Sequence, residues 1–379
     1  MNATDVVLFG SFAATLLGIA RFHARALHIA IAGLAAALIV RFTATDFDVV
    51  AHFLHEGKTL ANLAGLLLGF AVLADHFERS HAPEHLTTLL PNGRAGAFVL
   101  LVLVALLSAV LDNIAAALIG GAAALASFRS RVHIGYLAAI VAASNAGGAG
   151  SVIGDTTTTM LWIEGASPLT VARAALGAVV SLLFFGWIAS GQQHALQPLE
   201  PKAETPPPID GPRLLVVLAI LGGAIGANLW LDFPAAGVWL AILLGATLRR
   251  PDWGVLRHAT PGTIFLCCLV VTASLMPVRA LPEPSLWTTA GLGVVSAFFD
   301  NIPLTKLAID QGGYDHGLLA YAVGYGGSML WFGSSAGVAI SSAFPQAKST
   351  AAWLRHGWHV AVGYLLGFTA MALVFGWRP

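Results

Sequence analysis

A carboxylate followed by an amide occurs twice in strongly apolar surroundings. Asp112-Asn113 lies in the run LLSAVLDNIAAALIGG, and Asp300-Asn301 lies in GVVSAFFDNIPLTKLAI. In both runs a Ser-Ala pair begins four residues before the Asp, and an Ile follows the Asn. A charged side chain at the centre of a bilayer costs roughly 2.5–3.5 kcal/mol on insertion scales. A chain that places two carboxylates in the same costly context is expected to use them.

The chemistry open to these residues involves a monovalent cation and a proton. Carboxylate, amide, hydroxyl and free carbonyl oxygens are hard ligands that suit a cation such as Na⁺. A carboxylate in a desolvated place also takes up a proton more readily, because burial disfavours its charged form. One carboxylate that holds either ion, but never both, is the minimal chemistry of antiport. The sequence therefore predicts Na⁺ ligands at Asp112, Asn113, Asp300 and Asn301.

Two glycine-rich interruptions carry further oxygen ligands. Residues 144–162 read SNAGGAGSVIGDTTTTMLW, and residues 324–337 read GYGGSMLWFGSSAG. Setting Gly147-Gly148 against Gly326-Gly327 also sets Gly154 against Gly333, so the two interruptions share one register. The candidate ion or substrate ligands in these interruptions are Ser144, Asn145, Asp155, Thr156, Thr157, Ser334 and Ser335.

Composition indicates the elements that must position these residues. The chain has 379 residues, of which 57% are hydrophobic and 10% charged, and its mean hydropathy is +0.79. A soluble domain carries about 25% charged residues. Long apolar runs such as residues 169–190 are typical of membrane helices. The sequence therefore predicts an all-α, multi-pass integral membrane protein, and its net charge of zero gives no support to nucleic-acid binding.

The order of the segments repeats after about 190 residues. We expect a first repeat over residues 1–190, a proline-rich linker over 191–212 and a second repeat over 213–379. Each repeat has three plain segments, a segment broken by Asp-Asn, a Gly-rich interrupted segment and a final segment, which is typical of transporters. The apolar segments are 5–20, 26–40, 59–75, 95–127, 134–163 and 169–190, and then 213–230, 234–248, 263–278, 285–311, 317–343 and 357–376.

The distribution of Lys and Arg predicts the orientation. If 95–127 and 285–311 are re-entrant hairpins that enter and leave on one side, 13 Lys and Arg residues fall on one side and five on the other. Cytoplasmic loops carry the excess of Lys and Arg. Five full spans per repeat then make the two repeats inverted, with the first hairpin opening to the cytoplasm, the second opening outward, and both termini outside. The two Asp-Asn tips can thus meet near the midplane.

An Asp-Asn hairpin tip followed by the Gly-rich break GDTTTTMLW resembles the ion transporter superfamily, and most closely its NhaD-type sodium/proton antiporter branch. That superfamily also includes citrate transporters, arsenite permeases and divalent-anion/sodium symporters. The resemblance covers both repeats. It implies two inverted repeats with broken helices at 134–163 and 317–343, an elevator-type movement of a transport domain against a scaffold, and a homodimer.

Two functional hypotheses follow, and neither is an enzyme. The first is exchange of Na⁺ or Li⁺ for H⁺ across a bacterial inner membrane, with no cofactor. The second is ion-coupled transport of an anion such as citrate, a dicarboxylate or arsenite. Lys306, six residues after Asp300, keeps the second open, because it could bind an anion, neutralise Asp300, or simply extend to the outer interface. If only one carboxylate carries the ion, Asp112 is the favoured candidate.

Overall fold

The protein is described by a computed structural model that covers residues 3–22, 25–44, 47–82, 85, 88, 90–199 and 207–379. These residues form helices, turns and connections, and no strand occurs among them. The expected all-α class is confirmed. The first half contains α1 (Ala3–Arg21), α2 (Ala26–Ala44), α3 (Val49–Glu78), α5 (Gly93–Ser108), α6 (Asn113–Ser127), α7 (Ile134–Ala149), α8 (Thr156–Ile163), α9 (Pro168–Ala172) and α10 (Ala174–Leu196).

The second half follows the same order of elements. It contains α11 (Gly211–Leu231), α12 (Pro234–Gly245), α13 (Gly254–Ser274), α14 (Leu286–Ser296), α15 (Asn301–Gln311), α16 (His316–Gly326), α17 (Ser335–Ala343) and α18 (Thr350–Phe375), with short 3-10 turns at Val278–Ala280 and Pro345–Lys348. Residues 200–206 of the expected linker lie outside the described residues, and α10 continues to Leu196 before that linker.

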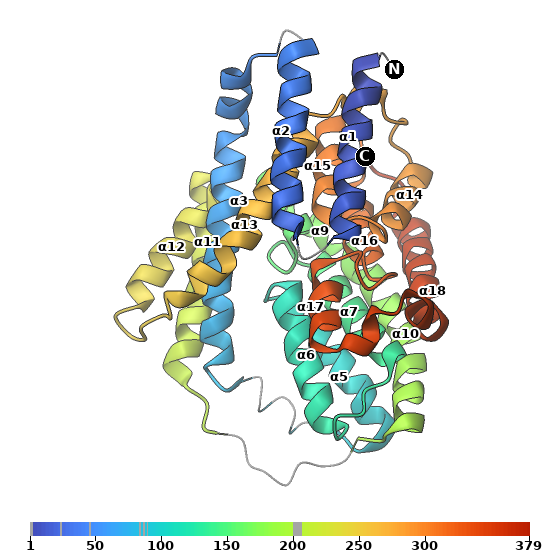
Figure 1. The fold of residues 1–379 in the computed structure, drawn as a ribbon. Helices are drawn as coiled ribbons and strands as arrows, with labels where there is room; N and C mark the ends of the chain where they lie inside the picture. Colours follow the sequence, from blue (N-terminus) through green and yellow to red (C-terminus); the bar gives the residue numbers. More distant parts are fainter. Residues whose placement is uncertain are drawn as a thin grey trace.

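The helices form two groups (Figure 1). The first group comprises α1–α3 and α11–α13, in which α3 packs on α13, α12 and α11, and α2 packs on α13. The second group comprises α5–α10 and α14–α18. In this group α10 packs on α18 and α7, α5 packs on α7, and α14 packs on α16. The groups meet chiefly where α13 contacts α15 and where α3 contacts α8. The two groups thus each combine helices from both halves of the chain.

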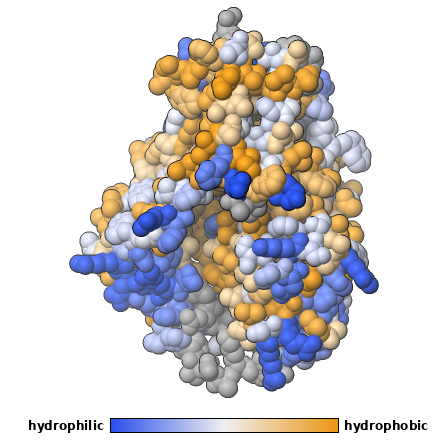
Figure 2. Space-filling view, in the orientation of Figure 1, coloured by the Kyte–Doolittle hydropathy of each residue, from blue (hydrophilic) through white to orange (hydrophobic). Residues whose placement is uncertain are grey.

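Six helical stretches are long and apolar enough to cross a membrane: Ala26–Ala44, Val49–Glu78, Pro168–Leu196, Gly211–Leu231, Gly254–Ser274 and Thr350–Phe375. Much of the upper part of the molecular surface in Figure 2 is hydrophobic, as a lipid-facing surface would be, and hydrophilic residues gather toward the lower edge. Together with the composition, these helices identify an integral membrane protein.

Both Asp-Asn segments fold as two short helices joined by a tight turn. Helices α5 and α6 have 16 and 15 residues, and α14 and α15 have 11 each. At about 1.5 Å per residue, each is shorter than the roughly 30 Å hydrocarbon core of a bilayer. The interrupted segments are likewise two helices each, α7 with α8 and α16 with α17. The turns inside these four segments converge on the centre of the second group.

Helix α3 is longer than its apolar segment. The sequence predicts a span over 59–75, whereas α3 begins at Val49, where the Asp48 side chain accepts a hydrogen bond from the Ala51 N–H at 3.0 Å. The additional first turns contain the polar residues Glu56 and Lys58, so this part of the helix is not recognised as an apolar segment. Glu56 is nevertheless only 7% exposed, because the tertiary structure supplies a buried partner for its carboxylate.

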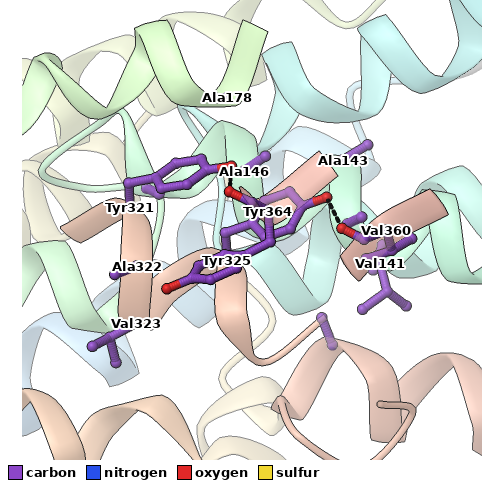
Figure 3. Close-up of a cluster of buried hydrophobic side chains, with 14 of the residues drawn as sticks. Val141, Ala143, Ala146, Ala178, Tyr321, Ala322, Val323, Tyr325, Val360 and Tyr364 are labelled. Carbon is purple, nitrogen blue, oxygen red and sulfur yellow. Dashed lines mark hydrogen bonds between the residues drawn. The ribbon is translucent and has the colours of Figure 1, made fainter. Parts of the chain in front are cut away.

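Three stacked tyrosines fill the core of the second group (Figure 3). Tyr321 and Tyr364 lie nearly parallel at 5.9 Å between ring centroids, and Tyr325 stacks on Tyr321 at 5.3 Å. The Tyr321 hydroxyl donates to the Tyr364 carbonyl, and the Tyr325 hydroxyl donates to the Val360 carbonyl. A buried tyrosine needs such a partner for its hydroxyl. The stack therefore fixes α16 against α18 directly behind the Gly-rich interruption.

Candidate functional site

The two hairpin turns have nearly the same backbone geometry. Asp112 caps α6 with φ −55° and ψ 142°, and Asp300 caps α15 with φ −53° and ψ 140°. Each carboxylate accepts a hydrogen bond from the N–H two residues later, at Ile114 and Ile302. An Asp at this position satisfies one of the free N–H groups of a helix start. Capping thus explains why Asp precedes Asn at both tips, and it directs each Asn into the first turn.

Asp155 lies between the two tips. Its carboxylate accepts hydrogen bonds from Asn113 Nδ2 at 3.1 Å and from Asn301 Nδ2 at 3.2 Å. All three side chains are buried, with exposures of 3–5%. The donors come from α6 and α15, in different halves of the chain, and the acceptor precedes α8. The candidate site is therefore built jointly by both halves, with the Asp155 carboxylate at its centre.

Asn145 extends this network across the second group. Its Oδ1 accepts from Asn113 Nδ2 at 3.1 Å, and its Nδ2 donates to Ser328 Oγ at 2.9 Å and to Ser334 Oγ at 3.0 Å. Ser334 also caps α17 by accepting from the Gly337 N–H. The two interrupted helices are consequently joined through side chains at their breaks.

The glycines of the two interruptions make matching contacts. A Cβ on Gly147 would lie 2.0 Å from the Ala105 carbonyl oxygen, and one on Gly326 would lie 2.1 Å from that of Gly293. In the same way, a Cβ on Gly154 would lie 2.1 Å from the Ser108 carbonyl oxygen, and one on Gly333 would lie 2.4 Å from that of Ala297. Only glycine permits a backbone approach this close. These contacts pack each interrupted helix against the last turn of the first hairpin helix, α5 or α14. The interruptions therefore lie beside the Asp-Asn turns.

The two halves differ at two pairs of corresponding positions in the interruptions. In the shared register Asn145 corresponds to Gly324, and Asp155 corresponds to Ser334. Asn145 reaches Ser334, whereas a Cβ on Gly324 would lie 3.1 Å from Asp155 Oδ2. Because Gly324 has no side chain, the Asp155 carboxylate can lie directly beside its backbone. The first interruption thus contributes a carboxylate to the site, whereas the second contributes the neutral hydroxyl of Ser334 at the corresponding position.

Hydroxyl groups complete the surroundings. The Ser335 hydroxyl donates to Asp300 Oδ2 at 3.2 Å. Thr157 Oγ1 is buried and has no hydrogen-bond partner of good geometry, although Thr157 stands two residues from Asp155. The Ser144 hydroxyl donates to the Val141 carbonyl within its own helix, and no hydrogen bond joins it to the other candidate ligands among the described residues. A buried hydroxyl without a partner is unusual and is suited to a ligand that the protein does not itself supply.

Two cavities reach the tips. A cavity of about 660 Å³ is lined by Asp112, Asp155 and Thr156 at one end and by Glu78 and His258 at the other. A second cavity of about 450 Å³ is lined by Asp300, Ser334 and Ser335, and it extends to α13 and the neighbouring ends of α1 and α2. Among the described residues no group of three or more His, Cys, Asp or Glu side chains could hold a metal ion. Mixed carboxylate, amide and hydroxyl oxygens are what the cavities offer.

Lys306 does not pair with Asp300. Its Nζ lies 3.0 Å from Glu56 Oε2 and 2.7 Å from Asp310 Oδ1, and the residue is 2% exposed. Six residues along a helix amount to about 9 Å of rise and to a different face, so the two side chains point apart. Because Lys306 is buried in an ion pair, it also does not extend to the outer interface. Its pairing leaves the tip site without a lysine partner.

Sequence reasoning missed Glu56 and Asp310. Asp310 stands four residues after Lys306, and this i,i+4 spacing of opposite charges was the available signal. The repeat register does place Gly324 opposite Asn145. Nothing in the sequence pointed from Glu56 to Lys306, which is 250 positions later.

Comparison with known proteins agrees with the resemblance. The sequence model of the citrate transporter family matches residues 6–324. Sodium/proton antiporter 1 of Arabidopsis thaliana is 30% identical over 244 residues, which cover 53% of this chain and 42% of the plant protein. Sodium/proton antiporter 2 of the same plant is 28% identical over 255 residues, which cover 54% of this chain and 59% of the relative. The chain spans about half the length of these curated relatives.

Proposed function

Because this chain belongs to the citrate transporter family, we propose that it is a secondary active transporter that exchanges Na⁺ or Li⁺ for H⁺ across a bacterial inner membrane. The observation that carries the proposal is the convergence of both hairpin tips on one buried carboxylate, Asp155. The names of the two plant relatives, both sodium/proton antiporters, support the same exchange.

The chemistry of the proposal is competition at the carboxylates. Asp112, Asp155 and Asp300 lie at the ends of two cavities, so a cation and a proton can each reach them. When no cation is bound, a proton neutralises the central carboxylate, because an unpaired charge is costly in a buried place. When Na⁺ binds Asp155, the Thr157 hydroxyl supplies a neutral ligand. Asn113 and Asn301 direct their Nδ2 atoms at Asp155 in this structure, so they become ligands when their side-chain amides rotate to present oxygen. Either ion satisfies the site, and the two exclude each other.

Alternating access by an inverted, elevator-type mechanism is the second part of the proposal. In support, α2 packs on α13 as α12 packs on α3, which is the exchange that a two-fold relation between the halves produces. The matching contacts of Gly147 and Gly326 support the same relation. The first helix group is proposed as the scaffold, and the second, which holds the site, as the part that moves.

The proposed orientation places the linker inside and both termini outside. Arg79 pairs with Asp252, and Arg249 with Asp210, so residues proposed as cytoplasmic contact one another. On the proposed outer side, Lys58 pairs with Asp232. Since Glu78 and His258 line the far end of the larger cavity, the structure corresponds in this scheme to an inward-facing state. A homodimer is proposed from the family resemblance alone.

Citrate or another anion is the second candidate, and the family's description is the observation that favours it. The site itself opposes it. Asp112 and Asp155 line one cavity and Asp300 lines the other. Lys306, the cation nearest in sequence to Asp300, is paired with Glu56 and Asp310. An anionic substrate would meet repulsion from the carboxylates that line these cavities.

The decisive experiment uses purified protein in proteoliposomes with an imposed Na⁺ gradient. We expect wild type to drive proton movement and Asp155→Asn to reduce it at least 100-fold, because the variant keeps the size of the side chain but has no charge with which to bind a cation or a proton. Asp232→Asn, the same change at an exposed position, is the matched control and should keep the wild-type rate. Full activity in Asp155→Asn would reject the assignment. Uptake of radiolabelled citrate by wild type, without sodium-driven proton movement, would favour the second candidate.

A further inference from the structure

A buried ion pair joins the two helix groups at a distance from the tip site. Lys306 Nζ lies between Glu56 and Asp310, and the side chains of Lys306 and Glu56 are only 3% and 9% exposed. Glu56 belongs to α3 in the first group, whereas Lys306 and Asp310 belong to α15 in the second. The pair therefore crosses the boundary along which the two groups would have to move.

The two partners of Lys306 would behave differently in such a movement. Asp310 is one turn further along the same helix and travels with Lys306. Glu56 is fixed in α3 and would be left behind. Lys306 would thus stay neutralised throughout, while Glu56 would lose the ammonium group that lies 3.0 Å away. Breaking a buried pair leaves an uncompensated charge, which is strongly destabilising unless the group becomes neutral.

The pair also lies on the side of the site opposite to the larger cavity. That cavity is lined by α3 residues from Leu63 onward to Glu78. Glu56 precedes Leu63 by seven residues, or about 10 Å along the helix, in the other direction. In this structure the cavity leads away from the ion pair, so the pair helps to close the opposite side.

Other titratable groups face the triad from neighbouring elements. Glu164, at the end of α8, interacts electrostatically with Asp310 and accepts a hydrogen bond from Thr59 on α3. His52, one turn before Glu56, interacts with both Glu56 and Lys306, and its Nε2 bonds to Ser274 Oγ on α13. His55 and Arg41 act on His52 in turn. The surroundings of Lys306 thus supply more carboxylates than the one ammonium can neutralise.

We propose that Glu56 is a second proton-binding carboxylate of this protein, which takes up a proton when Lys306 leaves it. The step transfers one proton from the outer water phase to a Glu56 oxygen as the ion pair separates. The same proton returns to water when the pair re-forms. The inference rests on the proposed transport function for its role in the cycle, but the protonation of an unpaired Glu56 stands on the geometry alone.

The first experiment tests that protonation without measuring transport. Lys306→Met leaves both Glu56 and Asp310 without the ammonium group, so Asp310 is neutralised as well in the test variant Lys306→Met/Asp310→Asn. In that variant Glu56 is the remaining unpaired carboxylate, and we expect its melting temperature to be closer to that of wild type at pH 5 than at pH 8. Glu56→Gln, which leaves Lys306 with Asp310, should show no such pH dependence. The triple variant Glu56→Gln/Lys306→Met/Asp310→Asn should lose the pH-dependent difference. If the difference from wild type in Lys306→Met/Asp310→Asn is the same at both pH values, the proposal fails.

The second experiment tests the link to movement in proteoliposomes, in a background with Cys267→Ser and Cys268→Ser. The pair Glu56→Cys/Lys306→Cys is joined by a reducible bifunctional thiosulfonate. Joining should reduce sodium-driven proton flux at least tenfold, and a reductant should restore it. Lys58→Cys/Asp232→Cys, joined within the first group, should keep its flux within twofold.

Unchanged flux in the joined Glu56/Lys306 pair would overturn the role in movement. Absence of sodium-driven flux in wild type would instead reject the proposed function. In that case the melting experiment still decides whether an unpaired Glu56 binds a proton.

Discussion

At the scale of single residues, the centre of the candidate site is Asp155. Both Asp-Asn tips reach it through their amides, while Asp112 and Asp300 cap their own helices and line separate cavities. The sequence favoured Asp112 as the ion carrier, because it is the carboxylate with Asn145 and Asp155 on the neighbouring interruption. The geometry shifts our proposal to Asp155, since it is the one of the three carboxylates Asp112, Asp155 and Asp300 that accepts hydrogen bonds from side chains of both halves, among the residues described.

Thr157 provides a test at this scale. Its Oγ1 has no hydrogen-bond partner of good geometry among the described residues, so Thr157→Val should leave the melting temperature unchanged or slightly higher. If the hydroxyl is a cation ligand, the KM for Na⁺ should rise about tenfold, which corresponds to about 1.4 kcal/mol. The measurement is sodium-driven proton flux against Na⁺ concentration.

Thr158→Val is the matched control for that test. Its Oγ1 donates to the carbonyls of Ser151 and Asp155, so its loss should cost about 1 kcal/mol of stability instead. An unchanged KM in Thr157→Val would remove Thr157 from the proposed ligands.

At the scale of elements, glycines decide how the interrupted helices meet the hairpins. Helix α7 contacts the end of α5 at Gly147, and α16 contacts α14 at Gly326. At each glycine, a carbonyl oxygen of the neighbouring helix lies where a side chain would otherwise be. The serine hydroxyls of the two hairpins add a second tie, from Ser108 to the Ser144 carbonyl and from Ser296 to that of Val323. The breaks are therefore held at the tips by backbone contacts that larger residues would prevent.

A substitution series tests this packing. Gly147→Ala and Gly326→Ala should each lower stability by about 1–3 kcal/mol, the usual cost of overpacking a well-packed core. Gly291→Ala on α14 is the control, because its Cβ would meet nothing within 4 Å. The measurement is the melting temperature of each of the three variants in detergent, compared with that of wild type. Equal melting temperatures for Gly326→Ala and Gly291→Ala would contradict the packing argument.

At the scale of the whole molecule, charged loops are tied together at both ends of the first helix group. Asp252 joins the end of α3 to the start of α13, and its pKa is lowered by the Gly254 N–H and by Arg79. At the other end Arg41 donates to the Leu275 carbonyl at 2.6 Å. These ties connect the two halves of the chain and fix the loops that the proposed orientation assigns to each side.

Labelling of single cysteines tests the orientation. In a background lacking Cys267 and Cys268, Arg250→Cys should react with a membrane-impermeant maleimide only after the cells are opened. Glu283→Cys should react in intact cells, because it precedes the hairpin proposed to open outward. Both positions are exposed, so accessibility and not burial decides the result. The opposite labelling pattern would invert the proposed topology.

The sequence by itself determined the all-helical membrane class and the order of the segments, and it named most of the residues of the candidate site. Apolar runs interrupted by Asp-Asn and by Gly-rich stretches identify short helices and their breaks, because helix length and backbone freedom are local properties. The largest errors are the starts of α3, α13 and α18, which lie ten, nine and seven residues before the expected segments, because their first turns carry polar residues such as Glu56, Arg257 and Arg355. Only the tertiary structure placed Asp155 between two amides and Lys306 beside Glu56. Those pairings join residues 42 to 250 positions apart, and neither composition nor periodicity encodes such contacts.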